Sequence, residues 1–305
     1  MKKYFRHTIL LLFTAYFFGC GKPGPTELVN DIPNEEEPLQ IEVLALNPDD
    51  ALYKGTYDST GLLNEMPKAE NFLFISKNVV SEKFLSVGND VAEVFFFDNA
   101  QPIVLPNGRM VGFGMKKVNP PKINSVQTRE VMHSIQYGRS SSVMDTILGP
   151  KYMLSRSGLM GDALFLKYDN PVDFEYRKAM MGPNVPIKFS INMPDQIVGK
   201  VNVTQDNKKE KVLQLEWNKA TKDSVEIIIG GKMKNEKTAT AFFKLHVKDN
   251  GHIKIPPQLI TAIPKDRFDR LVFTFVRKSV SRRVEQSLEF FTIIQNTHSI
   301  IIDYP

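Results

Sequence analysis

Cysteine is the scarcest residue type in this chain of 305 residues, together with tryptophan, because Cys20 is its only example. No internal disulfide can form, so the fold must be held together by its hydrophobic core. Long apolar runs are missing too. The run from Ile9 to Phe18 has about ten residues, whereas a helix that spans a membrane needs about 20. Later apolar runs have only the length of a β-strand.

Sequence motifs for catalysis are also missing. The chain has no Gly-x-Ser-x-Gly elbow and no Ser-x-x-Lys motif, which mark two groups of serine enzymes. We find no motif for a nucleotide or a metal ion either. The sequence therefore predicts a protein that is not an enzyme and that carries no cofactor and no metal.

Charge of one sign is not concentrated anywhere in the chain. The formal net charge of +5 arises from 39 basic and 34 acidic residues, and three of the basic residues lie in the first six positions. Without that segment the balance is 36 to 34, or +2. Nucleic-acid binding needs a concentrated basic face, so we expect no nucleic-acid partner.

The first twenty residues have the pattern of an export signal. Basic residues at positions 2, 3 and 6 precede the apolar run, and Gly19-Cys20 follows it. Phe17-Phe18-Gly19-Cys20 resembles a bacterial lipobox, in which the cysteine after a small residue is lipidated. The resemblance implies cleavage before Cys20 and a membrane anchor on that residue. The alternative is a cleaved secretory signal with an incidental cysteine.

Residues after Cys20 bear on the location of the protein. Gly21 is not the aspartate that marks inner-membrane retention in enteric bacteria, so the resemblance implies the outer membrane or the cell surface, with a periplasm-facing position also open. Residues 20–40 contain four prolines and an acidic run at 35–37. About twenty such residues form a solvated tether that spans roughly 25 Å.

Most of the remaining chain predicts an all-β fold, because short runs of β-branched and aromatic residues recur between turn residues. We expect two β-sandwich domains after a signal peptide (1–19) and the tether (20–40), namely an N-terminal β-rich domain (41–183) and a C-terminal domain (184–305). The expected strands fall at 41–46, 72–75, 91–97, 103–105, 110–113, 130–137, 188–191, 201–204, 213–217, 225–229 and 271–276, with a last pair near 284–294 and 299–302 and a short helix at 256–263.

A pattern in the C-terminal part has a family resemblance. Leu213-x-Leu215-x-Trp217, a polar loop and Val225-x-Ile227-x-Ile229 together resemble two successive strands of a fibronectin type III or immunoglobulin-like domain. The resemblance implies a role in binding or spacing.

Three segments have a less regular pattern. Gly138–Asp162 is rich in serine and glycine and predicts a long loop, with a helical turn at 143–148; it is a candidate working surface. Asn170–Met181 fits either a short helix or a strand at 172–176. Phe242–Ile255 predicts a hairpin that pairs Val247 with Ile253 around a turn containing Gly251.

Five arginines are the candidate binding residues. Arg277, Arg282 and Arg283 flank a predicted hairpin tip at 279–281 and could meet phosphate or an acidic partner. Arg139 and Arg156 lie in the serine-rich loop. The alternative is a set of solvated side chains.

Histidines give only weak signals for chemistry. His133 lies on an apolar strand face and is expected in the core, although a hydrolase triad with Asp145 and a loop serine is the enzymatic alternative. In the predicted hairpin His246 and His252 share an outer face, but lysines on that face disfavour a metal. His298 is expected in a turn.

Together these observations predict a membrane-anchored bacterial lipoprotein that acts as a non-enzymatic binding or scaffolding module, with an envelope protein or a glycan as its partner. One alternative is a carbohydrate-binding surface lipoprotein that assists polysaccharide uptake. The other is a hydrolase.

Overall fold

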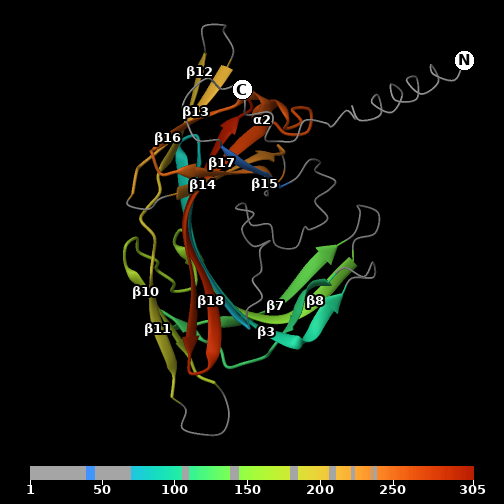
Figure 1. Cartoon of the computed structure of the whole chain (residues 1–305), viewed down its shortest axis with the longest axis vertical. Helices are drawn as coiled ribbons and strands as arrows, with labels where there is room; N and C mark the ends of the chain where they lie inside the picture. The colour runs from blue at the N-terminus through green and yellow to red at the C-terminus, as the bar shows by residue number, and fades with distance from the viewer. Residues whose placement is uncertain are drawn as a thin grey trace, which may run out of the picture.

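The computed structural model describes residues 39–44, 70–104, 110–137, 144–178, 185–205, 211–220, 224–234, 236 and 239–305. These residues form an all-β fold with one 11-stranded sheet, one four-stranded sheet and one three-stranded sheet (Figure 1). The short helix α2 (Pro257–Thr261) confirms the helix expected at 256–263.

The large sheet has the strand order β1-β15-β14-β17-β18-β2-β3-β8-β7, while β4 pairs with β3 and β9 with β8. It is strongly curved (Figure 1). Its strands are β1 (Gln40–Val43), β2 (Asn71–Glu82), β3 (Leu85–Val104), β4 (Met110–Met115), β7 (Arg129–Tyr137), β8 (Met144–Ser157), β9 (Met160–Gly161), β14 (Ser224–Lys232), β15 (Ala239–Lys248), β17 (Arg270–Glu285) and β18 (Leu288–Asp303).

The centre of this sheet joins segments that are far apart in the sequence. Strand β18 pairs in parallel with β2, from Phe290 opposite Asn71 to Ile301 opposite Glu82. The sheet therefore contains strands from both sides of the expected boundary at 183/184. The structure does not confirm a division into two domains there.

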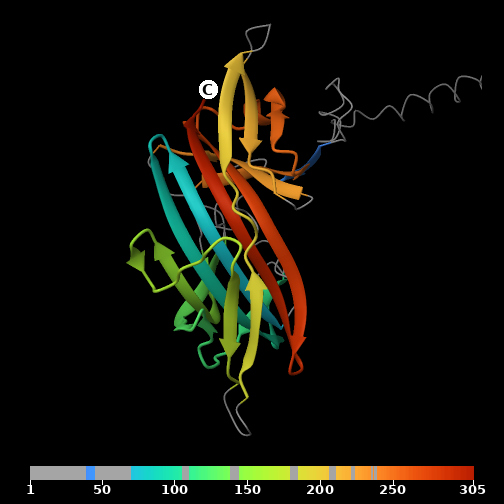
Figure 2. The same cartoon turned by 90° about the vertical axis from the view of Figure 1, so that its left-hand side faces the viewer.

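Two small sheets cover the convex side of the large sheet, one above the other (Figure 2). The four-stranded sheet has the order β11-β10-β5-β6 and the three-stranded sheet the order β12-β13-β16. Facing sheets of this kind are compatible with a β-sandwich. The strands are β5 (Lys122–Ile123), β6 (Val126–Gln127), β10 (Pro171–Tyr176), β11 (Ile187–Asn192), β12 (Gly199–Gln205), β13 (Lys211–Trp217) and β16 (His252–Ile255).

Each small sheet closes a hydrophobic core against the large sheet. Alternate residues of β17 and β18 point to the convex side, because side chains alternate along a strand. Phe273 and Phe275 of β17 pack with Leu215 and Trp217 beneath the three-stranded sheet. Phe290 of β18 packs in the core beneath the four-stranded sheet. The fold thus rests on apolar burial, as the lack of disulfides requires.

The connection between the two small sheets, residues 193–199, crosses the large sheet and is held by polar side chains. The Asn296 side chain donates hydrogen bonds to the carbonyl oxygens of Pro194 and Asp195. The backbone N–H of Gly199 donates to His298 Nδ1 at 2.8 Å. His298 therefore lies inside β18, and its expected place in a turn is wrong.

Two irregular segments are strands. Most of the expected loop at 138–162 is strand β8, and the helical turn at 143–148 is wrong for its described residues 144–148, which lie in that strand. Residues 138–143 lie outside the described residues. Pro171–Tyr176 is strand β10, so the strand alternative for this segment is confirmed and the helix alternative is wrong.

The hairpin expected at 242–255 does not form. Strand β15 pairs with β1 and β14 in the large sheet, whereas β16 pairs with β13 in the three-stranded sheet. Gly251 does adopt a positive φ of 91°. The chain uses that turn to pass between sheets. The expected last pair of strands is also different, since β17 and β18 form one long hairpin with its turn at 286–287.

The other expected strands are confirmed where the structure describes them. Residues 72–75, 91–97, 130–137, 188–191, 201–204, 213–217, 225–229 and 271–276 all lie in strands. Val104 pairs with Met110, as a hairpin at 103–113 requires, while the turn residues 105–109 lie outside the described residues. Likewise β1 covers 40–43, and residues 45–46 of the expected first strand lie outside them.

Candidate binding face

The predicted arginines do not form one site. Arg156 of β8 lies over the Phe165 ring at 3.8 Å. Arg282 pairs with Glu289 at 3.2 Å, and Arg283 lies over the Phe189 ring at 4.8 Å. Arg282 and Arg283 are neighbours in β17, but their side chains lie on opposite faces of the sheet, over Phe291 and Phe189. Arg139, like the predicted lipidation site Cys20, lies outside the described residues.

Arg277 is not a surface residue, which corrects its placement beside a hairpin tip. Its side chain is completely buried. Its guanidinium donates two hydrogen bonds to Asp249 Oδ2, at 3.1 Å and 2.8 Å, and one to the Gln196 carbonyl oxygen at 2.7 Å. Arg277 therefore holds the three-stranded sheet and the connection at 193–199 onto β17, and it cannot meet an external phosphate.

His133 of β7 is buried, and the structure shows why its imidazole stays neutral. It packs edge-on against Phe95, with the two ring centres 5.9 Å apart. Burial, followed by the nearby positive charge of Lys151, lowers the pKa of His133 to about 4. Its Nε2 has no hydrogen-bond partner among the residues that the structure describes. Asp145 has no described side chain and serines 140–142 lie outside the described residues, so the triad stays a prediction.

The remaining histidines lie in different surroundings. His246 and His252 belong to two different sheets, so they are not neighbours on one face. Because His298 Nδ1 accepts the Gly199 N–H, its Nε2 carries the proton and donates to Ser81 Oγ at 2.8 Å. Burial lowers the pKa of His298. Within the described part of the chain, no group of three or more His, Cys, Asp or Glu could hold a metal.

A cluster of polar side chains lies on the concave face of the large sheet, opposite the small sheets. Strand register places its members in two neighbouring rows across five strands, β15, β14, β17, β18 and β2. We call this set the polar cluster: Ser76, Asn78, Glu226, His246, Lys278, Gln295 and Thr297.

Hydrogen bonds connect one half of the polar cluster. Gln295 Nε2 donates to Ser76 Oγ at 3.0 Å, and Ser76 Oγ donates to Asn78 Oδ1 at 2.5 Å. Thr297 Oγ1 donates to the same Asn78 oxygen at 2.8 Å. Gln295 is completely buried and Ser76 nearly so. This half is an ordered network whose side chains have fixed directions.

Charged groups form the other half of the polar cluster. Lys278 Nζ lies 2.6 Å from Glu226 Oε1, and His246 Nδ1 lies 3.4 Å from that same oxygen. The Glu226 side chain is 8% exposed, whereas those of Lys278 and His246 are 27% and 38% exposed. Solvent therefore reaches the edge of the cluster beside Lys278 and His246.

Two acceptor atoms in the polar cluster have no partner among the described residues. Glu226 Oε2 and Gln295 Oε1 are buried and accept no hydrogen bond from that part of the chain. Gln295 is directly opposite Lys278, which in turn binds Glu226. An unpaired buried acceptor costs about 1–3 kcal/mol. A ligand that donates hydrogen bonds to these two atoms, beside Lys278, would therefore bind more favourably here than elsewhere on this face.

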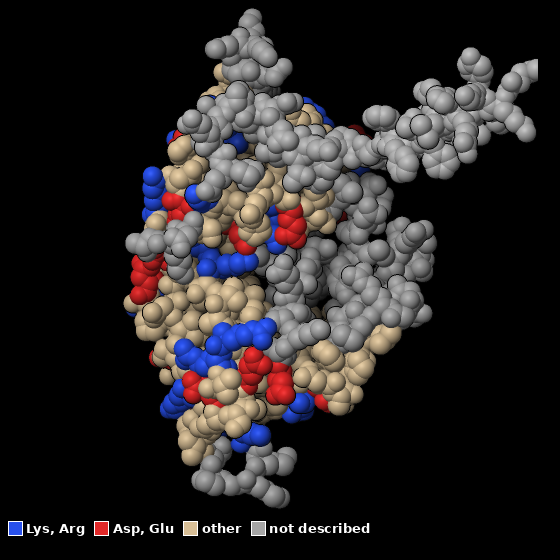
Figure 3. Space-filling view, viewed as in Figure 1, with Lys and Arg blue, Asp and Glu red and all other residues tan. Residues whose placement is uncertain are grey.

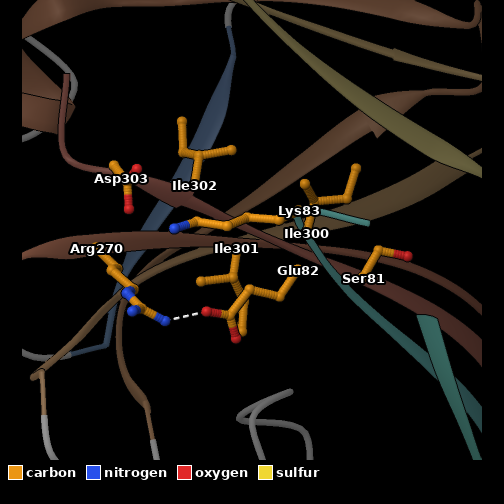
Figure 4. Close-up of a pocket in the computed structure, with 8 residues that line it drawn as sticks. All are labelled: Ser81, Glu82, Lys83, Arg270, Ile300, Ile301, Ile302 and Asp303. Carbon is orange, nitrogen blue, oxygen red and sulfur yellow. Dashed lines mark hydrogen bonds and ion pairs between the residues drawn. The ribbon is translucent and has the colours of Figure 1, made fainter. Parts of the chain in front are cut away.

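A pocket of about 320 Å³ lies farther along the sheet, where β2 ends beside β18 (Figure 4). Ile300, Ile301 and Ile302 line it, together with Ser81, Glu82, Lys83, Arg270 and Asp303. Arg270 pairs with Glu82, and Lys232 Nζ lies 3.9 Å from Glu82 Oε2. Its cations and carboxylates balance, so the pocket favours no ligand of one charge.

A pair of carboxylates lies at the start of β10 and in the 193–199 connection. A hydrogen bond with Asp195 raises the pKa of Asp169. Asp169 also has a positive φ of 58°. The group has only two members and lies at the surface. We assign it no catalytic role.

The face of the molecule in Figure 3 carries basic and acidic side chains side by side among uncharged ones. This mixture agrees with the small net charge of the sequence. No helix within the described ranges is long and apolar enough to cross a membrane.

Sequence reasoning missed the polar cluster because its residues come from five strands that are adjacent only in the folded sheet. One signal was available. Gln295, Thr297 and Ser299 alternate with apolar or buried positions in a strand that is otherwise rich in isoleucine. Polar residues at every second position predict one polar face. The partner strands could not be named from that pattern.

Comparison with known proteins gives no relative. No protein-family model matches the chain. No curated protein and no solved structure matches it either.

Proposed function

We propose that this chain is an exported, lipid-anchored binding module that holds a ligand or an envelope partner through the concave face of its large sheet. The observation that carries the proposal is a pair of buried acceptors, Glu226 Oε2 and Gln295 Oε1, that find no partner in the described ranges of the chain. Both belong to a cluster that reaches solvent at Lys278 and His246. A partner that donates hydrogen bonds there would offset the cost of leaving them unpaired.

A binding role fits the chemistry of this face better than catalysis does. Glu226 is held by Lys278, and the rest of the polar cluster consists of amides, hydroxyls and His246. Such groups orient a partner through hydrogen bonds. The immunoglobulin-like character expected for the C-terminal part would suit this role, and it belongs to the same proposal.

Carbohydrate is a narrower form of the proposal, because sugar hydroxyls donate hydrogen bonds. The aromatic side chains on the same face argue against sugar stacking. Phe72, Phe95 and Phe97 are buried, and their rings stack on one another at centroid distances of 5.6 Å and 6.1 Å. They do not offer the exposed ring faces that stacking would need. We therefore keep the ligand class open between a protein and a glycan.

Capture from detergent-solubilised membranes tests the binding role. The tagged protein is compared with Gln295→Leu, which removes one unpaired acceptor from the cluster, and with Arg282→Ala, an exposed control. We expect Gln295→Leu to lose a stoichiometric partner or a bound glycan, and the control to keep it. Equal capture by all three would overturn the assignment of this face.

Fractionation tests the anchor separately. Wild type should sediment with membranes, and Cys20→Ala should move largely to the soluble fraction. Mass spectrometry of the mature N-terminus should find acyl chains on Cys20 in wild type. If mass spectrometry finds no acyl chain on Cys20, the anchor is wrong, whatever the capture experiment shows.

A further inference from the structure

The β2–β3 hairpin presents apolar side chains at its outermost point. Glu82 pairs with Leu85, so Lys83 and Phe84 form the turn. Phe84 is fully exposed, at 102%, and Leu85 is 74% exposed. Lys83 takes a positive φ of 54° to make the turn. The residue next to the exposed Phe84 therefore has a backbone conformation that is unfavourable for lysine.

A second apolar tip lies at the same end of the strands, level with Gly88 and Asn89 of β3. Ser157 pairs with Met160 in the β8–β9 hairpin, where Leu159 is 93% and Met160 79% exposed. The backbone N–H of Gly158 donates to the carbonyl oxygen of Gly88 in β3 at 2.9 Å. This bond ties the second tip to the strand that carries the first. We call the two tips, Lys83–Leu85 and Gly158–Met160, the apolar tips.

We propose that the apolar tips insert into the lipid interface of the membrane to which the chain is anchored. Exposed apolar patches on soluble proteins mark interaction sites. These side chains project outward from hairpin turns. A fluid lipid surface can take up protruding apolar side chains without a matching cavity. Lys83 beside Phe84 can keep its ammonium group among the lipid headgroups while its methylene chain lies along the apolar surface.

The position of the tether is compatible with this contact. Register places Gln40 level with Asn78, four residues before the end of β2. Five strand spacings of about 4.8 Å separate β1 from β2, or roughly 24 Å. The tether of about twenty residues spans roughly 25 Å as a loose coil. The anchor and the first tip can thus touch one membrane surface. This step rests on the proposed anchor at Cys20.

Vesicle flotation of the unlipidated protein tests the tips without the anchor. The mature chain with Cys20→Ala is mixed with vesicles of phosphatidylethanolamine and phosphatidylglycerol. Two double variants, Phe84→Ala with Leu85→Ala and Leu159→Ala with Met160→Ala, remove the tips one at a time. Val203→Ala and Val284→Ala are matched controls, because both valines are exposed on other strands.

We expect each double variant to lower the vesicle partition coefficient at least about tenfold, because two apolar side chains leave the interface. The controls should bind like the parent. Circular dichroism should show unchanged folding, since the altered side chains lie in solvent.

The proposal is overturned if the parent does not float with vesicles, or if the tip variants float equally well. Loss of a captured envelope protein by the tip variants, with vesicle binding intact, would assign the tips to a protein contact instead. Failure of the anchor would appear as the absence of acyl chains on Cys20 in mass spectrometry and leave flotation unaffected. If the polar cluster is not a binding site, only the capture experiment would show it.

Discussion

Arg277 and Asp249 form a buried ion pair in which two guanidinium nitrogens face one carboxylate, with Nη2 at 3.0 Å from Oδ1 and Nε at 3.1 Å from Oδ2. The indole N–H of Trp217 donates to the same carboxylate at 2.7 Å. Both charges are almost completely excluded from solvent. The attraction within a buried pair offsets the cost of desolvation only with good geometry and additional hydrogen bonds. Here the carbonyl oxygens of Gln196 and Asn218 accept from Arg277, and the Ala220 N–H donates to Asp249.

Asp249→Asn should therefore destabilise the protein by about 3–5 kcal/mol, because it leaves the guanidinium charge buried without its counter-ion. Urea unfolding followed by the fluorescence of Trp217, the only tryptophan, measures the change. Glu289→Gln breaks the exposed pair with Arg282 and should cost less than about 1 kcal/mol. Equal effects of the two variants would contradict the structural role of Arg277.

Gly199→Ala should be strongly destabilising. A Cβ at this position would lie 2.2 Å from ring atoms of Phe275, which is buried in the core. The ring cannot move aside in a close-packed interior, so we expect a loss of about 1–3 kcal/mol. Gly88→Ala is the control, because its Cβ would meet only one atom, at 4.0 Å. Thermal unfolding of both variants distinguishes them.

Stability should fall as the pH drops from about 6.5 towards 4. The pKa of His133 is about 4 in the folded state and 6.5 in the unfolded state. Between those values the unfolded chain takes up a proton that the folded chain does not, so the free energy of unfolding decreases by about 1.4 kcal/mol per pH unit. The lowered pKa of His298 acts in the same direction.

His133→Gln should remove the contribution of His133 to the slope of the free energy of unfolding against pH. The contribution of His298 should stay. The measurement is urea unfolding at several pH values between 4 and 7. An unchanged slope in the variant would show that the imidazole of His133 does not resist protonation in the folded protein.

Lys83→Gly should stabilise the β2–β3 turn. Lys83 has a φ of 54°, a conformation that costs roughly 1–2 kcal/mol for a residue with a Cβ and that glycine adopts freely. We expect a gain of up to about 1 kcal/mol in thermal unfolding. Ser86→Gly in the adjacent strand should instead destabilise by about 0.5–1 kcal/mol. A loss in Lys83→Gly would mean that the lysine side chain contributes contacts beyond the turn.

Local sequence patterns predicted the individual strands well, because β-branched and aromatic runs such as 213–217 favour strand structure wherever they lie. They predicted partners poorly. Val247 and Ile253 lie on either side of a good turn, yet they belong to different sheets. Strand β8 was missed because its serines and glycines resemble a loop, although Tyr152 and Leu154 bury one of its faces.

The candidate sites depended still more on the folded arrangement. Arg277 has the appearance of a surface charge, and only the approach of Asp249 explains its burial. The polar cluster requires the strand order of the large sheet, which the sequence does not contain as a local pattern. The apolar tips needed the exact position of the β2–β3 turn.

The parallel pairing of β2 with β18 has a consequence for how the protein matures. Asn71 and Glu289, which meet in the finished sheet, are 218 positions apart in the chain. Contacts between such distant segments form slowly. During synthesis, strand β2 therefore has an unpaired edge until almost the whole polypeptide has emerged, and such edges invite aggregation. Protection by a holding chaperone would matter most in this interval, and premature termination ahead of β18 would leave the central sheet without the strand that joins its two halves.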